Sequence, residues 1–299
     1  LRRALECACD VVSQVPHRRW DVPVAAADVV SRVRHLSWMR DAELFDASAF
    51  SVSAAEARVM DPSQRRLLLA AGGSAPDDAG VFVAFAGSEF DEVVARERGG
   101  AGVYSATAST PSVASGRVSF SLGTTGPCLT IDTACSAFLS ALHSASSSVS
   151  GRECGVALVL GVALMLAPTV ACRFATAGMT SPRGRSRSFD SRADGYARAE
   201  ACVSSECEVA EDPVLCVVGS AVRQDGRSAS LTAPNGRAQA DLLRAACVDA
   251  ERLASVEAHG TGTALGDPIE ANSLREWLRT RRDACVVSGA KASMDTRRR

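Results

Sequence analysis

The stretch Cys128-Leu-Thr-Ile-Asp-Thr-Ala-Cys-Ser-Ala-Phe-Leu-Ser-Ala-Leu-His-Ser-Ala145 decides how the rest of the sequence is interpreted. Its first five residues predict a buried strand, and Phe138, Leu142 and Ala145 then recur at the spacing of one helix face. Cys135 therefore falls on a tight strand-to-helix turn, where the positive end of the helix dipole favours a thiolate. Because its neighbours are small, the sulfur is approachable, and Cys135 is a candidate covalent acyl carrier.

Further predicted strands alternate with helices or loops, which is the order typical of an α/β fold. The run from Cys154 to Cys172 contains no charged residue. A membrane-spanning helix needs about 20 apolar residues, but Gly155, Gly161 and Pro168 interrupt this run. We therefore predict a sheet strand covered on both faces and no membrane span. The other predicted strands are Val81–Ala86, Val156–Leu160 with its continuation, Val214–Gly219, Ser255–Ala258 and Cys285–Ser288.

Three short patterns predict helix starts by side-chain capping. In each pattern the first side chain is expected to accept an unpaired backbone N–H, and the residue three positions later to reach back. A proline at the first helical position costs no hydrogen bond there. The three capping pairs are Ser53 with Glu56, Asp61 with Gln64, and Asp267 with Glu270.

Composition and charge exclude several classes of protein. The chain has 299 residues, 46% of them hydrophobic, which is enough for one large or two ordinary domains. Its net charge of −1 gives no reason to expect a nucleic acid or an anionic membrane as a partner. The arginines at 279–282 and 297–299 are interpreted as solvated surface. No glycine-rich stretch has the GxGxxG spacing with a following acidic residue, so a dinucleotide-binding oxidoreductase is disfavoured.

The cysteines indicate a reducing compartment. Eleven cysteines are scattered without regular pairs, which does not suit a disulfide framework. Residues 1 to 20 are too charged to hold a signal peptide, so we expect a soluble, intracellular, cytoplasmic protein. Cys7 and Cys9 lie too close together for a zinc site, and no second Cys/His pair follows at ligand spacing. We therefore expect no bound metal.

Two long motifs resemble a known family. The run from Gly116-Arg-Val-Ser-Phe120 through Asp132-Thr-Ala-Cys-Ser-Ala137 resembles the active-site signature of β-ketoacyl synthases, in particular the ketosynthase domains of modular polyketide synthases and animal-type fatty acid synthases. The block Val256–Ala271, with His259-Gly-Thr-Gly-Thr263, is similar to the family's histidine motif. Weaker blocks keep the family's order from residue 15 to about 294, which makes the match specific. They are Val15–Asp21, Met60–Arg65, Ser188–Tyr196, Leu231–Gly236 and Ser288–Met294.

The resemblance implies a thiolase-like α/β fold, layered α-β-α-β-α, and a homodimer. Residues 1–215 would form the N-terminal half with Cys135, and residues 216–299 part of an incomplete C-terminal half with His259. The implied activity is an acyltransferase that performs decarboxylative Claisen condensation. An acyl group moves from a phosphopantetheine thioester to Cys135. A malonyl-type extender on acyl carrier protein then loses carbon dioxide, and its enolate attacks the acyl-enzyme. No cofactor is bound, since phosphopantetheine on the carrier protein is the substrate carrier.

The resemblance also implies roles for four further residues. His259 matches the first histidine of the family's Cys-His-His set, and a neutral imidazole can donate a hydrogen bond to the developing enolate oxygen. Thr261 and Thr263 match positions that contact the pantetheine arm. Lys291 matches the family's lysine, which orders the site electrostatically. Asp267 and Glu270 are interpreted as helix caps only.

Two departures from the family concern turnover. Where the family places Gly-His after its lysine, this chain has Asp295 and Thr296, and the later glycine-rich loop has no counterpart. We expect a chain truncated at both ends relative to the family, which accepts an acyl group at Cys135 yet condenses poorly or not at all. Two alternatives stay open, a catalytically impaired remnant that acts as a scaffold or dimerisation module, and a Cys-His hydrolase.

Overall fold

The computed structural model describes residues 10–21, 27–96, 103–247, 250–279 and 281–295. Predictions on Cys7, Cys9, Thr296 and residues 297–299 lie outside these ranges. By their internal contacts the residues form two compact units. We call Met39–Ala167 with Ala199–Val217 the sheet unit, and Leu1–Trp38 with Pro168–Arg198 and Val218–Arg299 the histidine unit. The division of the chain into two halves at residues 215 and 216 stays a prediction.

A four-stranded sheet in the order β4-β3-β5-β6 forms the middle of the sheet unit. β3 runs parallel to β4 and β5, and β6 pairs antiparallel with β5 along eight residues. Both central strands are apolar in sequence and buried, as predicted for strands covered on two faces. The strands are β3 (Gly80–Ala84), β4 (Cys128–Ile131), β5 (Val156–Ala163) and β6 (Ala201–Glu208).

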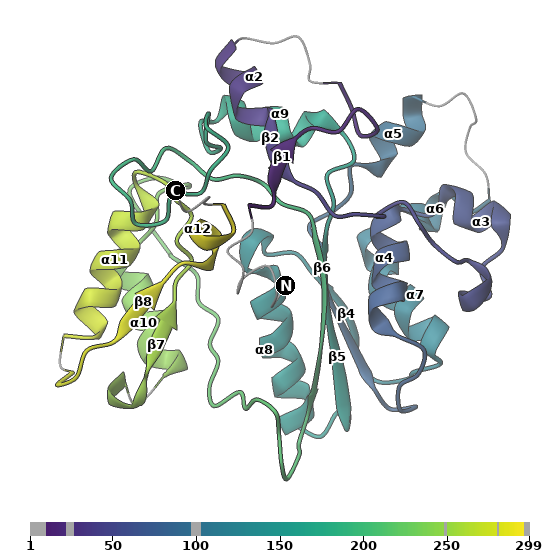
Figure 1. The fold of residues 1–299 in the computed structure, drawn as a ribbon. Coiled ribbons are helices and arrows are strands. Elements are labelled where there is room, and N and C mark those ends of the chain that lie inside the picture. Colours follow the sequence, from purple (N-terminus) through teal and green to yellow (C-terminus); the bar gives the residue numbers. More distant parts are fainter. Residues whose placement is uncertain (1–9, 22–26, 97–102, 248–249, 280, 296–299) are drawn as a thin grey trace. The chain divides into compact units, whose positions relative to one another are not determined.

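Helices cover both faces of this sheet (Figure 1). Side chains alternate between the faces of a strand, so Val81 and Val83 of β3 pack toward α4 (Pro62–Ala71) and α7 (Pro111–Leu122). Phe82 and Ala84 pack on the other face against the small residues of α8 (Ala137–Ser150). The remaining helical segments of this unit are η1 (Ser48–Phe50), α3 (Ala54–Val59), α5 (Phe90–Arg96), α6 (Ser105–Ala108) and η2 (Ala134–Ser136).

Two of the three predicted caps form. The Ser53 hydroxyl accepts from the Glu56 backbone N–H, and an Asp61 carboxylate oxygen accepts from the Ser63 N–H at 2.6 Å. The expected reach back from the third residue is wrong in both cases. The half-buried guanidinium of Arg117 instead donates to the Glu56 carboxylate and to the Gln64 side-chain oxygen, because a buried cation needs several acceptors.

The histidine unit contains two small two-stranded sheets, each with its own helices. The antiparallel pair of β1 and β2 accompanies α2 and α9, which share the apolar residues Val33, Ala171 and Ala175. The parallel pair of β7 and β8 accompanies α10 and α11, whose core contains Ala258, Leu274 and Trp277. The elements are β1 (Val12–Gln14), α2 (Ala27–Val33), β2 (His35–Ser37), α9 (Pro168–Thr176), α10 (Gly236–Ala246), η3 (Ala250–Arg252), β7 (Ser255–Glu257), α11 (Gly266–Trp277), β8 (Val286–Ser288) and α12 (Ala290–Asp295).

Two strand predictions need correction. Val214–Gly219 forms no strand, and Val214 and Val218 are 98% and 97% exposed. Its apolar residues have high strand propensity, but a strand also needs a neighbour for its backbone hydrogen bonds, and no described strand pairs with this segment. The second correction concerns β4, which is an edge strand with Cys128 and Leu129 exposed, not a buried strand.

In the run from Cys154 to Cys172, Val156–Ala163 forms the strand β5, as predicted, whereas Pro168 begins the helix α9 (Pro168–Thr176), which was not predicted. Among the described residues, no helix is long and apolar enough to cross a membrane.

The packing of α4 against the sheet leads to a prediction about stability. Leu67 is fully buried in the core of the sheet unit, while Leu69 on the same helix is 38% exposed. We expect Leu67→Ala to lower the free energy of unfolding by about 2–5 kcal/mol, because it leaves a cavity. Leu69→Ala is the matched control and should cost less than about 1 kcal/mol. Urea denaturation followed by circular dichroism measures both values. Equal effects of the two substitutions would contradict this packing.

Candidate active site

Cys135 lies on the predicted turn between β4 and α8, and it is exposed. The residue before it, Ala134, has the left-handed backbone angle φ of 52°, which a residue with a Cβ rarely adopts. The Asp132 carboxylate stabilises this turn by accepting from the Ala134 N–H at 2.9 Å. Cys135 is therefore presented at the beginning of α8, the end of a helix that favours negative charge.

Three hydroxyl groups surround the turn that carries Cys135. Ser136 Oγ donates to the Thr133 backbone carbonyl at 2.8 Å and lies 2.9 Å from Thr133 Oγ1. Thr133 Oγ1 in turn lies 3.1 Å from Ser140 Oγ, one turn further along α8. These contacts link the turn to the helix and fix the backbone on both sides of the thiol.

His259 begins a loop without regular structure that connects β7 with α11. The backbone N–H groups of such a loop need acceptors from elsewhere. Glu270 supplies them, because its two carboxylate oxygens accept from the N–H groups of His259 at 2.6 Å and Gly260 at 2.8 Å. The His259 side chain is exposed.

Asp267 holds the second part of this loop. One oxygen of its buried carboxylate accepts from the N–H groups of Gly262 at 3.0 Å and Thr263 at 3.2 Å. The other oxygen accepts from the N–H of Phe189 at 2.7 Å, so a distant segment is tied to the same carboxylate. Gly262 has a φ of 79°, and a Cβ there would lie 2.6 Å from the Arg187 backbone nitrogen. Only glycine fits this position without strain.

Thr261 and Thr263 lie side by side in the same loop. Their hydroxyl oxygens are 3.1 Å apart, and both residues are partly buried. Two adjacent hydroxyl groups can each donate and accept a hydrogen bond. Within the loop, the Thr261 hydroxyl also donates to the Asp267 carboxylate at 3.4 Å, and the Thr263 hydroxyl accepts from the Gly266 N–H at 3.1 Å.

Lys291 lies in α12, and its ammonium group donates to the backbone carbonyl of His259. Glu257 at the end of β7 positions this helix, since its carboxylate accepts from the Ala290 N–H at 2.5 Å and from the Ser288 hydroxyl at 2.7 Å. The parallel pairing of β7 with β8 brings the two segments together. The lysine and the histidine loop are thus connected directly.

The structure brings four of the five predicted site residues, His259, Thr261, Thr263 and Lys291, into the histidine unit, whereas Cys135 belongs to the sheet unit. Their catalytic and binding roles stay predictions. In the described part of the chain, no three or more His, Cys, Asp or Glu residues are grouped as metal ligands would be.

The interpretation of Asp267 and Glu270 as caps is wrong. α11 begins at Gly266, the residue before it makes no side-chain cap, and both carboxylates bond the His259 loop. The Asp-Pro-x-Glu pattern fits a helix start equally well, so the pattern alone does not distinguish the two uses. The available signal was the preceding loop, which is rich in glycine and has no strand or helix to satisfy its N–H groups. The contacts that Glu257 and Phe189 make around this loop were not predicted from the sequence.

The role of Asp267 can be tested by removing its carboxylate. Asp267→Ala leaves three backbone N–H groups without their acceptor, so we expect the free energy of unfolding to fall by about 2–3 kcal/mol. Hydrogen exchange at the amides of Gly262 and Thr263 should become faster. Asp283→Ala, at an exposed position of the same unit, is the control. Unchanged exchange in Asp267→Ala would show that other groups hold this loop.

Comparison with known proteins gives the family. The sequence matches the family model "Beta-ketoacyl synthase, N-terminal domain" over residues 2–205 and "Beta-ketoacyl synthase, C-terminal domain" over residues 214–295. It is 39% identical over 290 residues to a phenolphthiocerol/phthiocerol polyketide synthase of Mycobacterium tuberculosis, covering 88% of this chain and 16% of that protein. It is 36% identical over 294 residues to a mycocerosic acid synthase-like polyketide synthase of Mycolicibacterium smegmatis, covering 89% of this chain and 14% of that protein.

Solved structures agree with this match. The ketosynthase from module 6 of the bacillaene synthase of Bacillus subtilis 168 superposes with a TM-score of 0.86 at 26% identity, over 98% of this chain and 54% of that one. An oxazolomycin ketosynthase domain of Streptomyces albus JA3453 gives a TM-score of 0.86 at 28% identity, over 98% and 57%. The chain spans about half the length of these structures, and the expected thiolase-like α/β fold is confirmed. By sequence and by structure, the chain belongs to the β-ketoacyl synthase family.

Proposed function

We propose that the chain acts as the acyl-accepting part of a β-ketoacyl synthase in polyketide or fatty acid synthesis. The observation that carries the proposal is the exposed Cys135 on a left-handed turn at the beginning of α8. Its thiolate attacks the carbonyl of an acyl thioester, a new thioester forms on Cys135, and the phosphopantetheine thiol leaves. In the family's second step a malonyl-type extender loses carbon dioxide, and the resulting enolate carbon attacks this acyl group and expels the Cys135 thiolate. We expect this step to be slow in this chain, because Asp295 and Thr296 stand where the family places Gly-His.

The histidine loop would act in the second step. Glu270 and Lys291 hold the backbone of His259 from its N–H and its carbonyl, which orients the residue. A neutral imidazole can then donate to the enolate oxygen and stabilise the charge that forms there. Thr261 and Thr263 would bond the amides of the pantetheine arm.

Lys291 has a feature that supports its role. It is the only lysine among the 33 basic residues of the sequence. Its ammonium group is a compact point charge with three donors, whereas the planar guanidinium of arginine presents its donors in a fixed fork. We therefore expect that arginine does not replace it.

The expected partners are acyl carrier protein, with its acyl and malonyl thioesters, and a second copy of the chain. β4 pairs among the described strands with β3 alone, and Leu129 on it is 45% exposed. An open edge of this kind can pair with another strand, which supports the homodimer. The cytoplasmic location stays a prediction.

The acyl-accepting role of Cys135 can be tested by intact mass. Incubation of the chain with an acyl-N-acetylcysteamine thioester should add one acyl group, because the thiol is exposed and placed at a helix N-terminus. Cys135→Ala should remove the adduct, whereas Cys128→Ala should keep it, since Cys128 is also exposed but lies within β4.

Other outcomes of this experiment separate the alternatives. A folded chain without any adduct would indicate a scaffold or dimerisation module. Continuous release of free acid would indicate a Cys-His hydrolase. An adduct that survives Cys135→Ala would place the acylation on a different residue and overturn the proposal.

The role of His259 concerns the extender, not the acylation. In His259→Ala we expect the release of carbon dioxide from a malonyl thioester to slow by about 10²–10⁴-fold, the usual contribution of one such residue, while Cys135 is still acylated. His17→Ala is the control, because His17 is exposed in a different part of the same unit. Equal decarboxylation by wild type and His259→Ala would contradict the assigned role.

A further inference from the structure

An aromatic side chain, that of Phe138, lies one helical turn after Cys135. Cys135 belongs to η2, and Phe138 belongs to the first turn of α8, which follows η2 directly. Residues three positions apart in a helical segment are neighbours on its surface, with about 5–6 Å between their Cβ atoms. Phe138 is partly buried and packs against the apolar core between α8 and the sheet. Its ring therefore lies beside the place where an acyl group on Cys135 would begin.

The part of the sheet under this ring carries small residues. Ile131, Ala84, Gly161 and Val203 form one row across β4, β3, β5 and β6, and the two central members are small. A Cβ on Gly161 would lie 2.8 Å from Phe138 Cδ2 and 3.4 Å from Val203 Cγ2. The ring thus fills the space that a side chain at position 161 would take. This row lies at the carboxyl ends of β3 and β4, the edge of a parallel sheet where ligands usually bind.

The surroundings of the ring are apolar on the helix side as well. Ala137 and Ala141 of α8 are buried in the same core, together with Ala84. Without the ring of Phe138, α8 and the sheet would enclose an apolar hollow, and such a hollow stays dry and accepts an apolar group. In a hydrophobic pocket, room for one more methylene group changes discrimination between substrates by about 10-fold or more. The size of residue 138 therefore decides whether a long acyl chain finds an apolar space here.

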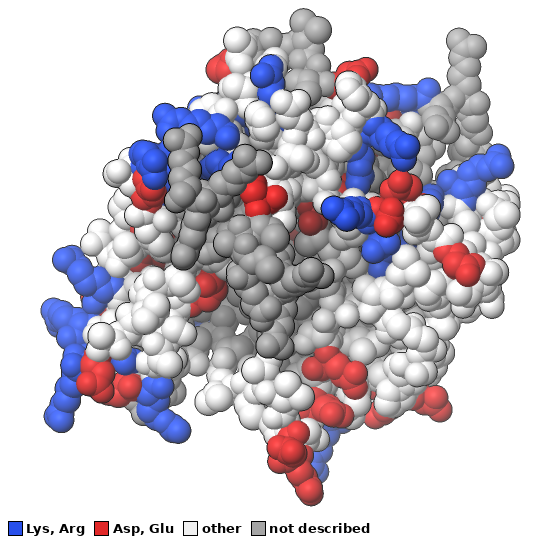
Figure 2. Space-filling view, in the orientation of Figure 1, with Lys and Arg blue, Asp and Glu red and all other residues white. Residues whose placement is uncertain are grey.

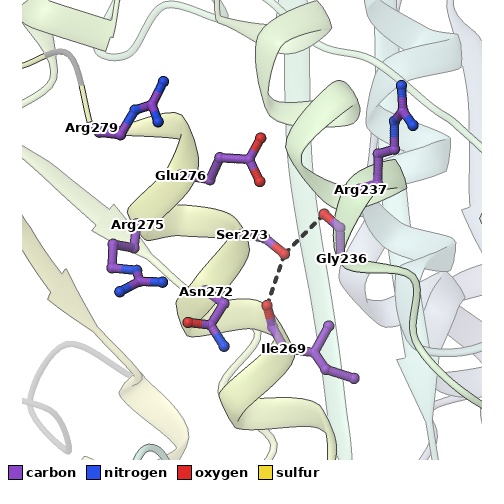
Figure 3. Close-up of a pocket in the computed structure, with 8 residues that line it drawn as sticks. All are labelled: Gly236, Arg237, Ile269, Asn272, Ser273, Arg275, Glu276 and Arg279. Carbon is purple, nitrogen blue, oxygen red and sulfur yellow. Dashed lines mark hydrogen bonds between the residues drawn. The ribbon is translucent and has the colours of Figure 1, made fainter.

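A cleft in the histidine unit has a different character. Figure 2 shows basic side chains gathered on the surface over α11. Beneath them, a cleft of about 830 Å³ between α10 and α11 has charged residues in its lining, among them Arg237, Arg275 and Glu276 (Figure 3). None of the five predicted site residues lines this cleft. It is therefore not where an apolar chain on Cys135 is expected to lie.

We propose that Phe138 sets the upper length of the acyl group that Cys135 accepts. Its ring closes the space between α8 and the small residues Ala84 and Gly161, so a short acyl group fits at Cys135 and a longer chain finds no apolar space beside the helix. The inference rests on the proposed function, because it requires acylation of Cys135. It adds the substrate class, which is short acyl thioesters such as acetyl and propionyl.

The test compares a short and a long acyl donor on the full chain. Intact mass measures the rates at which acetyl- and octanoyl-N-acetylcysteamine thioesters add an acyl group. Wild type should react faster with the acetyl donor. Phe138→Ala should raise the octanoyl-to-acetyl rate ratio by about 10-fold or more, because it opens the hollow beside Cys135. Leu139→Ala is the matched control, since Leu139 is the next residue of α8 but is 70% exposed, and it should leave the ratio unchanged.

A second substitution distinguishes an opened hollow from a loosened helix. Gly161→Ala, added to Phe138→Ala, places a methyl group back in the hollow from the side of β5, so the rate ratio should fall again. Loosening of α8 predicts no such reversal. Circular dichroism and the acetyl rate report whether each variant folds. Phe138→Leu keeps more apolar bulk and should give an intermediate ratio, so it replaces Phe138→Ala in the comparison if that variant does not fold.

The outcomes separate this inference from the proposed function. An unchanged ratio in a folded Phe138→Ala variant that still takes up acetyl groups would overturn the role of Phe138 and leave the acyl-accepting role of Cys135 intact. The same holds for an equal rise of the ratio in Leu139→Ala, or for a wild type that prefers the octanoyl donor. Absence of every adduct from the wild-type chain would overturn both.

Discussion

Burial of β3 and β5 on both faces is the constraint on which the sheet unit depends. Every residue of β3 is buried, and its side chains alternate between the α4–α7 face and the α8 face. Because α8 must lay its small residues against this sheet, its first turn is fixed relative to the end of β4. That turn is where Cys135 is exposed. The presentation of the thiol is thus a consequence of core packing, and the left-handed angle of Ala134 is the local cost of the short connection.

The histidine unit depends on a different interaction, the hydrogen bonds that carboxylates accept from backbone N–H groups. The loop that starts at His259 has no strand or helix partner, so its N–H groups depend on carboxylates. Asp267 and Glu270 lie in the first turns of α11 and accept from this loop, while Glu257 holds the beginning of α12. Three acidic residues therefore fix the backbone around His259 and Lys291. The side chains of His259 and Lys291 are exposed, while Thr261 and Thr263 are partly buried.

Much of the fold and of the candidate site could be predicted from the sequence. The features that could not be predicted were missed for physical reasons. The apolar runs of β3 and β5 and the turn at Cys135 follow from local patterns that the core reinforces. Val214–Gly219 has the same kind of pattern, yet strand formation depends on a neighbour that no local pattern contains. β6 was missed because it is a polar, exposed edge strand, whose residues do not alternate clearly. The use of Asp267 for loop binding was missed because a capping pattern and a loop-binding pattern have the same sequence.

The proposed chemistry requires that Cys135 and the His259 loop act on one acyl thioester. Lys291, the only lysine, donates to the carbonyl of His259, so it marks that loop uniquely. The most direct measurement is mass spectrometry of the chain treated with a short reagent that joins one thiol to one amine. We expect a cross-linked peptide pair that contains Cys135 and Lys291. Cross-links from Lys291 to other cysteines, with Cys135 modified but never joined to it, would contradict a shared site.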